Sequence, residues 1–306
     1  MGGNLVVIGS TNVDLTMRLD HLPSRGETVG NGDFYQAFGG KGAIQAIAAA
    51  RCGGKVKFIS CVGDDDFGRL AIESLKINGI NVDNVFAENG LNTGTALIFT
   101  DVQGNNCVGV SPGANESLLP EKIASASAAF ENVEMVLLQC EVPYDSIKYV
   151  IDASTKYNKK LILNLAPARN IDVSYLSKAH VLVVNEPEAE FLSGFKVNKD
   201  SDIEHVAELL LAKGSEHIII TLGARGAYYA TSGQNFFVES FSVEAKDSTG
   251  AGDIFCGALA VALTEKKSFK EALTFASAAA AISVTRLGAF PSAPRRAEIE
   301  ELAAKR

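Results

Sequence analysis

The chain has 306 residues, of which 47% are hydrophobic and 21% are charged, and its formal net charge at pH 7 is −8. This length allows one large domain with a sizeable core, and the acidic balance argues against a nucleic-acid-binding surface. No apolar run is long enough to span a membrane, so we expect neither a membrane nor a nucleic acid as a partner. The five cysteines include no CxxC pair, which indicates reduced thiols in a cytoplasmic protein.

From the N-terminus to about residue 250, short aliphatic runs alternate with amphipathic helical patterns. Turn or polar residues bound each run, which is typical of buried strands in a mostly parallel sheet. We expect such strands at Leu5–Ile8, Val56–Cys61, Met135–Gln139, Lys160–Asn164, Val181–Val184 and His217–Thr221. The clearest helical patterns are Phe67–Asn78, Pro143–Lys156 and Asp202–Lys213, followed beyond residue 250 by Ile254–Thr264, Phe269–Thr285 and Arg295–Lys305. This alternation predicts a three-layer α/β/α fold with a mostly parallel central sheet.

Two segments break the alternation. Thr16–Phe38 is extended and rich in turn residues, and Asn92–Val110 alternates apolar and polar residues as paired strands do. Both could be long surface loops, but the alternation favours strands outside the main sheet that form a small β-sheet lid. Because no repeat, low-complexity tract or linker is present, we interpret residues 1–306 as one domain with a lid built from about residues 14–40 and 92–112.

The most informative stretch is the turn DSTGAGD at residues 247–253, which leads into a long apolar helical pattern. Gly250 and Gly252 permit unusual backbone angles, and the first N–H groups of the helix, together with its dipole, favour a bound anion. Asp253 would repel a phosphate unless it faces a second substrate, where it could take a proton from an attacking hydroxyl. Asp253 could instead be only the N-cap of the helix. The turn is neither a Walker loop nor a GxGxxG dinucleotide motif.

Further polar residues follow other expected strands. In GSTNVD at residues 9–14, Asn12 and Asp14 suit sugar hydroxyls or could form an Asx turn. The glycine-rich turn GGKGA at residues 39–43 could let a ligand approach the backbone or could be a plain helix entry. Glu141 could join Asp14 in one polar pocket or cap the helix that follows it. In open α/β sheets ligands bind at the carboxyl ends of the strands, where these turns are expected.

Two later turns have the same position after a strand. In NEPEAE at residues 185–190, Asn185 and Glu188 have the spacing of a capping box, or they could lie near Mg²⁺ and phosphates, with Mg²⁺ bound through water. TLGARG at residues 221–226 could be a nucleotide-binding turn or an ordinary hairpin.

Taken together, these motifs resemble those of the ribokinase-like, pfkB-type carbohydrate kinase family. The resemblance covers essentially the whole chain, and the turn at residues 247–253 is its most specific part, followed by GGKG at residues 39–42. The other matches are the motifs at residues 9–14, 112–115, 185–190, 221–226 and 285–289.

The resemblance implies a role for each matching residue. Asp253 corresponds to the catalytic base, and the amides of Gly250, Ala251 and Gly252 to an anion hole for the transferred phosphoryl group. The sugar-binding positions are Asn12, Asp14, Gly40, Lys41, Glu141 and Asp253. The ATP-binding positions are Asn185, Thr221, Gly223, Gly226, Gly252 and Ser277. Glu188 corresponds to the glutamate associated with Mg²⁺, and an activating K⁺ would lie among Asp247, Thr249, Ser283, Arg286, Gly288 and Ser292.

The resemblance also implies the reaction and the assembly. The expected reaction is ATP-dependent phosphorylation of a pentose at its primary hydroxyl, foremost of D-ribose to D-ribose 5-phosphate, and the lid is expected to form a homodimer interface. A sugar-binding sensor without catalysis is a different possibility, but the intact run up to Asp253 argues against it. An NAD-dependent oxidoreductase would share the sheet but would need a dinucleotide fingerprint.

Two positions depart from the family pattern. Ile44 stands where the family usually has an Asn that binds sugar hydroxyls, and an unpartnered buried hydroxyl there would cost about 1–3 kcal/mol. Ser277 replaces the Asn or His more often found beside the adenine. Ile44 keeps open a different sugar (deoxyribose, another pentose or a ketose) or a nucleoside. The base of a nucleoside could stack on Phe34 and Tyr35, although core packing or a dimer contact is the favoured role of these two residues.

Overall fold

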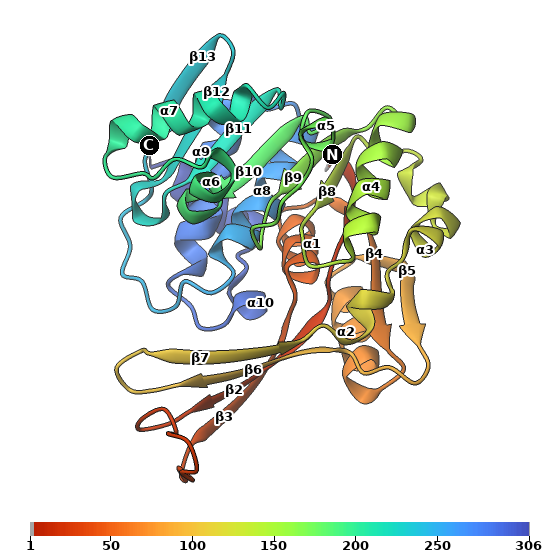
Figure 1. The fold of residues 1–306 in the computed structure, drawn as a ribbon, viewed down its shortest axis with the longest axis vertical. Helices are drawn as coiled ribbons and strands as arrows, with labels where there is room; N and C mark the ends of the chain where they lie inside the picture. The colour runs from red at the N-terminus through yellow and green to blue at the C-terminus, as the bar shows by residue number, and fades with distance from the viewer. Residues whose placement is uncertain (1–2, 306) are drawn as a thin grey trace.

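A computed structural model describes residues 3–305. Its main sheet has nine strands in the order β13-β12-β11-β10-β9-β8-β1-β4-β5 (Figure 1). The strands from β11 to β5 are parallel, and β12 and β13 extend the sheet as an antiparallel hairpin. These strands are β1 Asn4–Ile8, β4 Lys55–Gly63, β5 Asn81–Glu88, β8 Met135–Leu138, β9 Lys160–Asn164, β10 Val181–Asn185, β11 His217–Thr221, β12 Ala227–Thr231 and β13 Gln234–Val238. The expected strands are all present, and the three-layer fold is confirmed.

Helices cover both faces of this sheet, and each face has its own apolar core. In β1, Leu5 and Val7 pack into one core, whereas Val6 and Ile8 pack into the other, as the period of two along a strand requires. The first core is covered by α1 Lys41–Arg51, α2 Asp66–Ile77, α8 Ala251–Thr264, α9 Phe269–Ser283 and α11 Arg296–Ala303. The second is covered by α3 Pro120–Ser125, α4 Tyr144–Lys156, α6 Glu186–Ser193 and α7 Asp200–Leu211. The short helices are α5 Val173–Leu176 and α10 Ala289–Ser292, with 3₁₀ turns at Gly113–Ser117, Ser127–Phe130 and Gly223–Arg225.

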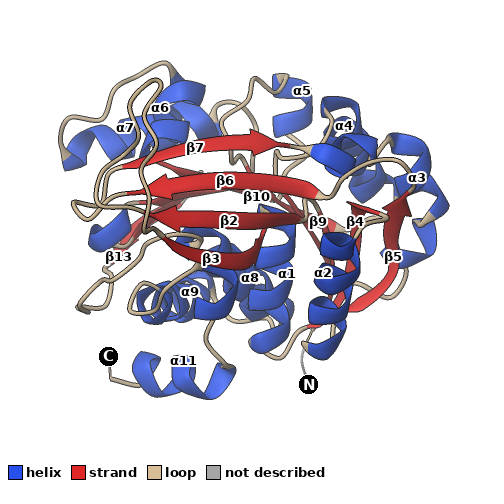
Figure 2. Cartoon of the chain, turned by 90° about the horizontal axis from the view of Figure 1, so that it is seen from below, coloured by secondary structure: helices blue, strands red, loops and turns tan. Residues whose placement is uncertain are grey.

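A separate small sheet has four strands in the order β3-β2-β6-β7, comprising β2 Asn12–Arg18, β3 Asp33–Gly39, β6 Gly94–Thr100 and β7 Asn106–Ser111. It projects from the main body (Figure 1), and its strands lie side by side in the second view (Figure 2). The two segments expected to leave the main sheet therefore do form strands. Only residues 9–11 separate β1 from β2, so the chain passes directly from the central strand into the small sheet.

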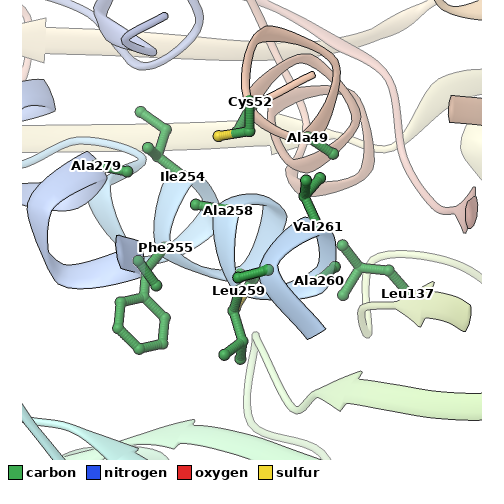
Figure 3. Packing of buried hydrophobic residues seen from close by; sticks show 14 of the residues in the cluster. Ala49, Cys52, Leu137, Ile254, Phe255, Ala258, Leu259, Ala260, Val261 and Ala279 are labelled. Carbon is green, nitrogen blue, oxygen red and sulfur yellow. The ribbon is translucent and has the colours of Figure 1, made fainter. Parts of the chain in front are cut away.

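The packing of α8 against α1 positions the turn at residues 247–253. The buried side chains of α8 lie against Ala49 of α1 and Cys52 at its C-cap, with Ala279 of α9 and Leu137 of β8 nearby (Figure 3). The two helices are in close contact at Gly257, where a Cβ atom would lie 2.5 Å from the backbone oxygen of Gln45. A side chain there would force the helices apart, so Gly257 sets their separation.

Two expectations about the chain's chemistry can be compared with the structure. All five cysteines are unpaired, and every one except Cys107 is buried. Within residues 3–305, no helix combines the length and the apolar character that crossing a bilayer requires.

Candidate active site

The turn at residues 247–253 opens helix α8. Gly250 is the N-cap and has a left-handed backbone with φ of 75°, which glycine adopts without strain. The first intrahelical bond is donated by Ile254 N to Gly250 O, and Ala251 N donates to Ser248 O. The N–H groups of Gly252 and Asp253 lie ahead of that first bond, and open space surrounds the Cα of Gly252. This end of the helix can therefore present backbone donors to an anion.

Asp253 lies inside the first turn of α8 and is not its N-cap, so the capping alternative is wrong. Asp253 is 6% exposed, and both of its carboxylate oxygens face α1. Lys41 Nζ lies 3.8 Å from Oδ2, and Gln45 Nε2 donates to Oδ1 at 2.8 Å. Burial raises the pKa of Asp253 above its ordinary value, and Lys41 and Gln45 oppose that rise. The pKa of Lys41 is raised, chiefly by the charge of Asp253.

The glycine-rich turn before α1 packs closely against the backbone of residues 10–12. Gly40 is the N-cap of α1 with φ of 85°, and a Cβ there would lie 2.8 Å from the backbone nitrogen of Asn12. Lys41 N donates to Glu141 Oε2 at 2.9 Å, and Ser10 Oγ donates to the same oxygen at 2.6 Å. Glu141 therefore joins the end of β1 to the start of α1 and does not cap α4.

Asn12 and Asp14 lie in strand β2, so the Asx-turn alternative is wrong. Asn12 is buried, and its Oδ1 accepts a hydrogen bond from Asn115 Nδ2 at 2.7 Å. Burial, followed by the nearby charge of Glu141, raises the pKa of Asp14 to about 6. Asp14 and Glu141 thus belong to one acidic cluster at the root of the small sheet.

Two adjoining cavities open at the carboxyl ends of the parallel strands, where β9, β10 and β11 end. The smaller, about 180 Å³, is lined by Lys41, Asn164, Ala166, Val183, Asn185, Glu188, Thr221, Ser248, Gly250, Ala251, Gly252, Asp253 and Cys256. The larger, about 550 Å³, is lined by Thr221, Gly223, Ala224, Gly226, residues 240–243, Ala245, Ser248, Ala251, Gly252, Phe255, Ser277, Ala280, Ala281 and Val284. Both contain Gly252 and Thr221, so the start of α8 lies where the two cavities meet.

Asn185 and Glu188 form a capping box and also line the smaller cavity. Asn185 Oδ1 accepts from Glu188 N at 2.8 Å, and Glu188 Oε2 accepts from Asn185 N at 2.9 Å. Burial raises the pKa of Glu188 despite that hydrogen bond. The capping and functional interpretations are therefore compatible, because one carboxylate oxygen caps α6 while the residue stays in the cavity wall.

The turn at residues 221–226 is a hairpin, as one of its alternatives expected, and it also lines a cavity, so its role in nucleotide binding stays a prediction. It connects β11 to the antiparallel strand β12, as a hairpin does, and Gly223 and Gly226 line the larger cavity. Gly226 has φ of 102°, and a Cβ there would lie 2.0 Å from the carbonyl oxygen of Val238. Ser277 of α9 is buried and also lines this cavity.

The residues matched to a monovalent-cation site come from the loop at residues 247–249 and from the loop between α9 and α10, with Ser283 and Ser292 in the helices that flank it. The structure brings these two loops together. Asp247 Oδ1 accepts from both the N–H and the hydroxyl of Thr249, and its Oδ2 accepts from Gly288 N at 2.8 Å. Burial raises the pKa of Asp247, but these hydrogen bonds outweigh it and leave the pKa below its ordinary value. Beside them, Arg286 donates to the carbonyl oxygen of Ser292, and the Ser283 hydroxyl donates to Ala280 O.

Sequence reasoning missed several residues of the site. Asn164 lines the smaller cavity, and Gln45, fully buried behind it, contacts Asp253. Residues 240–243 and Ala245 form one wall of the larger cavity. Asn164 and Gln45 are polar residues in otherwise apolar stretches, which is a usable signal, but the loop before residue 247 carries no distinctive pattern.

Comparison with known proteins agrees with this geometry. The family model described as pfkB family carbohydrate kinase matches residues 3–296. The chain belongs to this family. It is 38% identical to a ribokinase of Bacillus subtilis over 299 residues, covering 98% of this chain and 99% of the relative. It is 36% identical to a deoxyribokinase of Salmonella typhi, covering 97% of this chain and 98% of that protein.

Among solved structures, that of an Arabidopsis thaliana ribokinase complexed with ribose and ATP matches with a TM-score of 0.93 and 31% identity, covering 99% of each chain. The α/β/α architecture and the small sheet of this pfkB family member are thus those of the ribokinase fold. The chain is an ATP-dependent carbohydrate kinase, a sugar kinase of the ribokinase family.

Proposed function

We propose that this kinase transfers the γ-phosphoryl group of ATP to the primary hydroxyl of D-ribose and forms D-ribose 5-phosphate. The observation that carries the proposal is the position of Asp253. Its buried carboxylate lies in the wall of the smaller cavity, at the first turn of α8, where the two cavities share Gly252. A base placed beside an anion-binding helix end is suited to phosphoryl transfer to a hydroxyl.

The base, the anion hole and the sugar-binding residues can each be assigned in this arrangement. Asp253 removes the hydroxyl proton, the sugar oxygen attacks the γ-phosphorus, and the bond to the bridging oxygen of ADP breaks. The amides of Gly252 and Asp253, with the glycine turn at Gly250, hold the charge of the transferred group. Asn12, Asp14, Gly40, Lys41 and Glu141 bind the sugar at the root of the small sheet.

The larger cavity suits the nucleotide. Its walls contain Phe255 and Val284 for a flat apolar base, together with Thr221, Gly223, Gly226 and Ser277. It adjoins the smaller cavity, which Asn185 lines. Glu188 suits Mg²⁺ because its buried carboxylate lies in the cavity wall and Mg²⁺ accepts such ligands through water. When bound with ATP, Mg²⁺ neutralises charge on the phosphate oxygens.

We also assign the two loops joined by Asp247 to a K⁺ ion. Carboxylate, hydroxyl and carbonyl oxygens suit hard cations, and Asp247, Thr249, Ser283 and Ser292 provide them there. The site adjoins the turn that begins α8, so a bound cation would order the backbone of the anion hole.

The decisive experiment compares wild-type enzyme with Asp253→Asn. ATP consumption is measured with ribose and Mg²⁺ in K⁺ and in Na⁺, and ribose binding is measured by calorimetry. We expect ribose-dependent turnover that K⁺ stimulates, and a loss of about 10³-fold or more in the variant with ribose binding largely intact. Turnover unchanged by the substitution would exclude Asp253 as the base, and binding without any turnover in the wild type would indicate a sensor.

A second candidate substrate is a pentose that lacks one hydroxyl, such as 2-deoxyribose. Ile44 is 5% exposed, and a Cβ at Gly250 would lie 3.7 Å from its Cγ2, so an apolar side chain occupies the place beside the anion-hole turn. A relative that is 36% identical to this chain is a deoxyribokinase, so a deoxy sugar is a substrate found within the family. If Ile44 selects the deoxy sugar, Ile44→Asn should raise kcat/KM for ribose relative to deoxyribose by about 10-fold or more.

The small sheet is proposed to act both as a lid and as a dimer interface on a single domain. Strand register places Ala96 and Val110 on the same face as Asp14, the face we assign to the sugar, whereas Phe34, Leu97 and Phe99 share the other. Phe34 and Leu97 are 58% and 51% exposed, which is unusual for large apolar side chains unless a partner covers them. Sedimentation equilibrium should show a wild-type dimer and a Leu97→Lys monomer.

The unpaired thiols suit the reducing cytoplasm that we propose as the location.

A further inference from the structure

Helix α1 contacts Asp253 through two side chains that are one turn apart. Lys41 and Gln45 are four residues apart and so lie on the same side of α1. Lys41 Nζ lies 3.8 Å from Oδ2 of Asp253, and Gln45 Nε2 donates to Oδ1 at 2.8 Å. The two carboxylate oxygens therefore have different environments. One faces a flexible cation in the cavity wall, and the other faces a fully buried amide.

The orientation of the Gln45 amide is fixed by its neighbours. Its Nε2 also donates to Asn164 Oδ1 at 3.0 Å, and its Oε1 accepts from Gln139 Nε2 at 2.6 Å. Asn164 is held in turn, because its Nδ2 donates to Val183 O at 3.3 Å. Rotating the Gln45 amide by half a turn would set its oxygen against the oxygens of Asn164 and Asp253, which are both acceptors.

The side chains of this hydrogen-bond network are buried, so a misaligned amide would leave a buried polar atom without a partner and lower the stability of the fold. Gln45 and Gln139 are fully buried, and Asn164 is 7% exposed. Among the described residues, Gln139 Oε1 is the only buried side-chain oxygen or nitrogen without a hydrogen-bond partner. A glutamine whose carbonyl stays unpartnered while its amide donates to Gln45 costs stability, which points to a functional reason for keeping it.

We propose that Gln45 is a positioning residue, held by Gln139 and Asn164, that fixes Oδ1 of Asp253 so that Oδ2 is the oxygen that accepts the hydroxyl proton. Gln45 lies outside both cavity walls and acts only through Asp253. It also stabilises the ionised form of the base, because its hydrogen bond opposes the rise in the pKa of Asp253 that burial causes. This inference rests on the proposed role of Asp253.

The kinetic test uses Gln45→Met, which keeps the volume of the side chain and removes its donors. At pH 7 we expect kcat to fall about 10- to 100-fold while KM for both substrates changes less than about 3-fold. The acidic limb of the kcat profile should move to higher pH, so that part of the loss is recovered near pH 9. A loss of the same size at every pH, or no loss, would overturn the proposal.

Gln139→Met is a second, milder variant. It leaves Gln45 in place but removes the hydrogen-bond donor that fixes the orientation of the Gln45 amide. It should give a smaller change in the same direction. The matched control is Gln234→Met at the exposed start of β13, which should leave the profile unchanged. Wild-type behaviour of Gln139→Met would show that Gln45 needs no such support.

A measurement without catalysis separates this inference from the proposed function. The free energy of unfolding is measured between pH 5 and pH 8 for wild type, Gln45→Met, Asp253→Asn and the double variant. Ionising a buried carboxylate with a raised pKa lowers stability as pH rises, and losing Gln45 should steepen that fall only where Asp253 is present. Equal effects of Gln45→Met in both backgrounds would refute the coupling, whatever the substrate of the enzyme proves to be.

Discussion

Lys41 Nζ and Asp253 Oδ2 lie 3.8 Å apart, although the two residues are on different helices that are far apart in the sequence. Lys41 is the first residue of α1 and Asp253 belongs to the first turn of α8. The ammonium group therefore lies beside the oxygen to which we assign proton removal. Its positive charge opposes the effect of burial on the pKa of Asp253.

Lys41→Met should therefore lower kcat at pH 7, and the activity that remains should depend on pH. Without the charge, the pKa of Asp253 rises further, so less of the base is ionised and activity recovers as pH increases. We expect a loss of about 10- to 100-fold at pH 7, checked by the pH profile of kcat. Lys41→Arg keeps the charge, so an equally displaced profile in that variant would contradict this explanation.

Gly250→Ala should destabilise the protein and impair phosphoryl transfer together. The new methyl group would lie 2.5 Å from Cβ of Ala289 in a left-handed backbone conformation. We expect a loss of more than about 2 kcal/mol in the free energy of unfolding, measured with urea, with a fall in kcat. The matched control is Gly79→Ala, which has φ of 79° and open space around it and should lose only about 1 kcal/mol. Equal losses in the two variants would mean that contact with Ala289 has no effect.

Asp14→Asn should stabilise the protein near pH 7 while weakening sugar binding. The pKa of Asp14 is raised to about 6, so the folded chain holds a proton that the unfolded chain releases between roughly pH 4 and 6. The stability gained from that proton is complete below the ordinary pKa and is lost as pH rises through about 6. The substitution should raise stability at pH 7.5 by on the order of 1 kcal/mol and leave it unchanged near pH 3.5. A wild-type ribose KM that does not increase as pH falls through about 6 would argue against an ionised Asp14 at the sugar.

Asp247→Asn should weaken the response to K⁺. An amide has one acceptor oxygen, so it cannot keep the hydrogen bonds from both Thr249 and Gly288 that join the two loops. The rate is measured against K⁺ concentration, and half-maximal stimulation should need about 10-fold more K⁺ or more. Asp152→Asn, which removes a surface carboxylate paired with Lys178, is the control. An unchanged K⁺ response in Asp247→Asn would place the cation elsewhere.

The strands of the main sheet were predictable because burial on both faces requires continuous aliphatic runs such as Val181–Val184. Alternation in Asn92–Val110 predicted the small sheet. The sequence did not reveal that β2 begins at Asn12, because Gly9, Ser10 and Asn12 are common turn residues and favoured a turn at that point. The glycine turns were also legible, since left-handed backbone conformations at Gly40 and Gly250 favour glycine itself.

The sequence by itself therefore determined the fold class, the glycine turns at which we expect an anion to bind, and the candidate base, because each depends on residues close together in the chain. Tertiary structure alone decided what surrounds the base. Gln45 and Asp253 are 208 positions apart, and their hydrogen bond exists only because Gly257 lets α1 and α8 approach closely. Local pattern carries no information about such a contact, since it depends on how two helices cross and on which buried amides lie next to them.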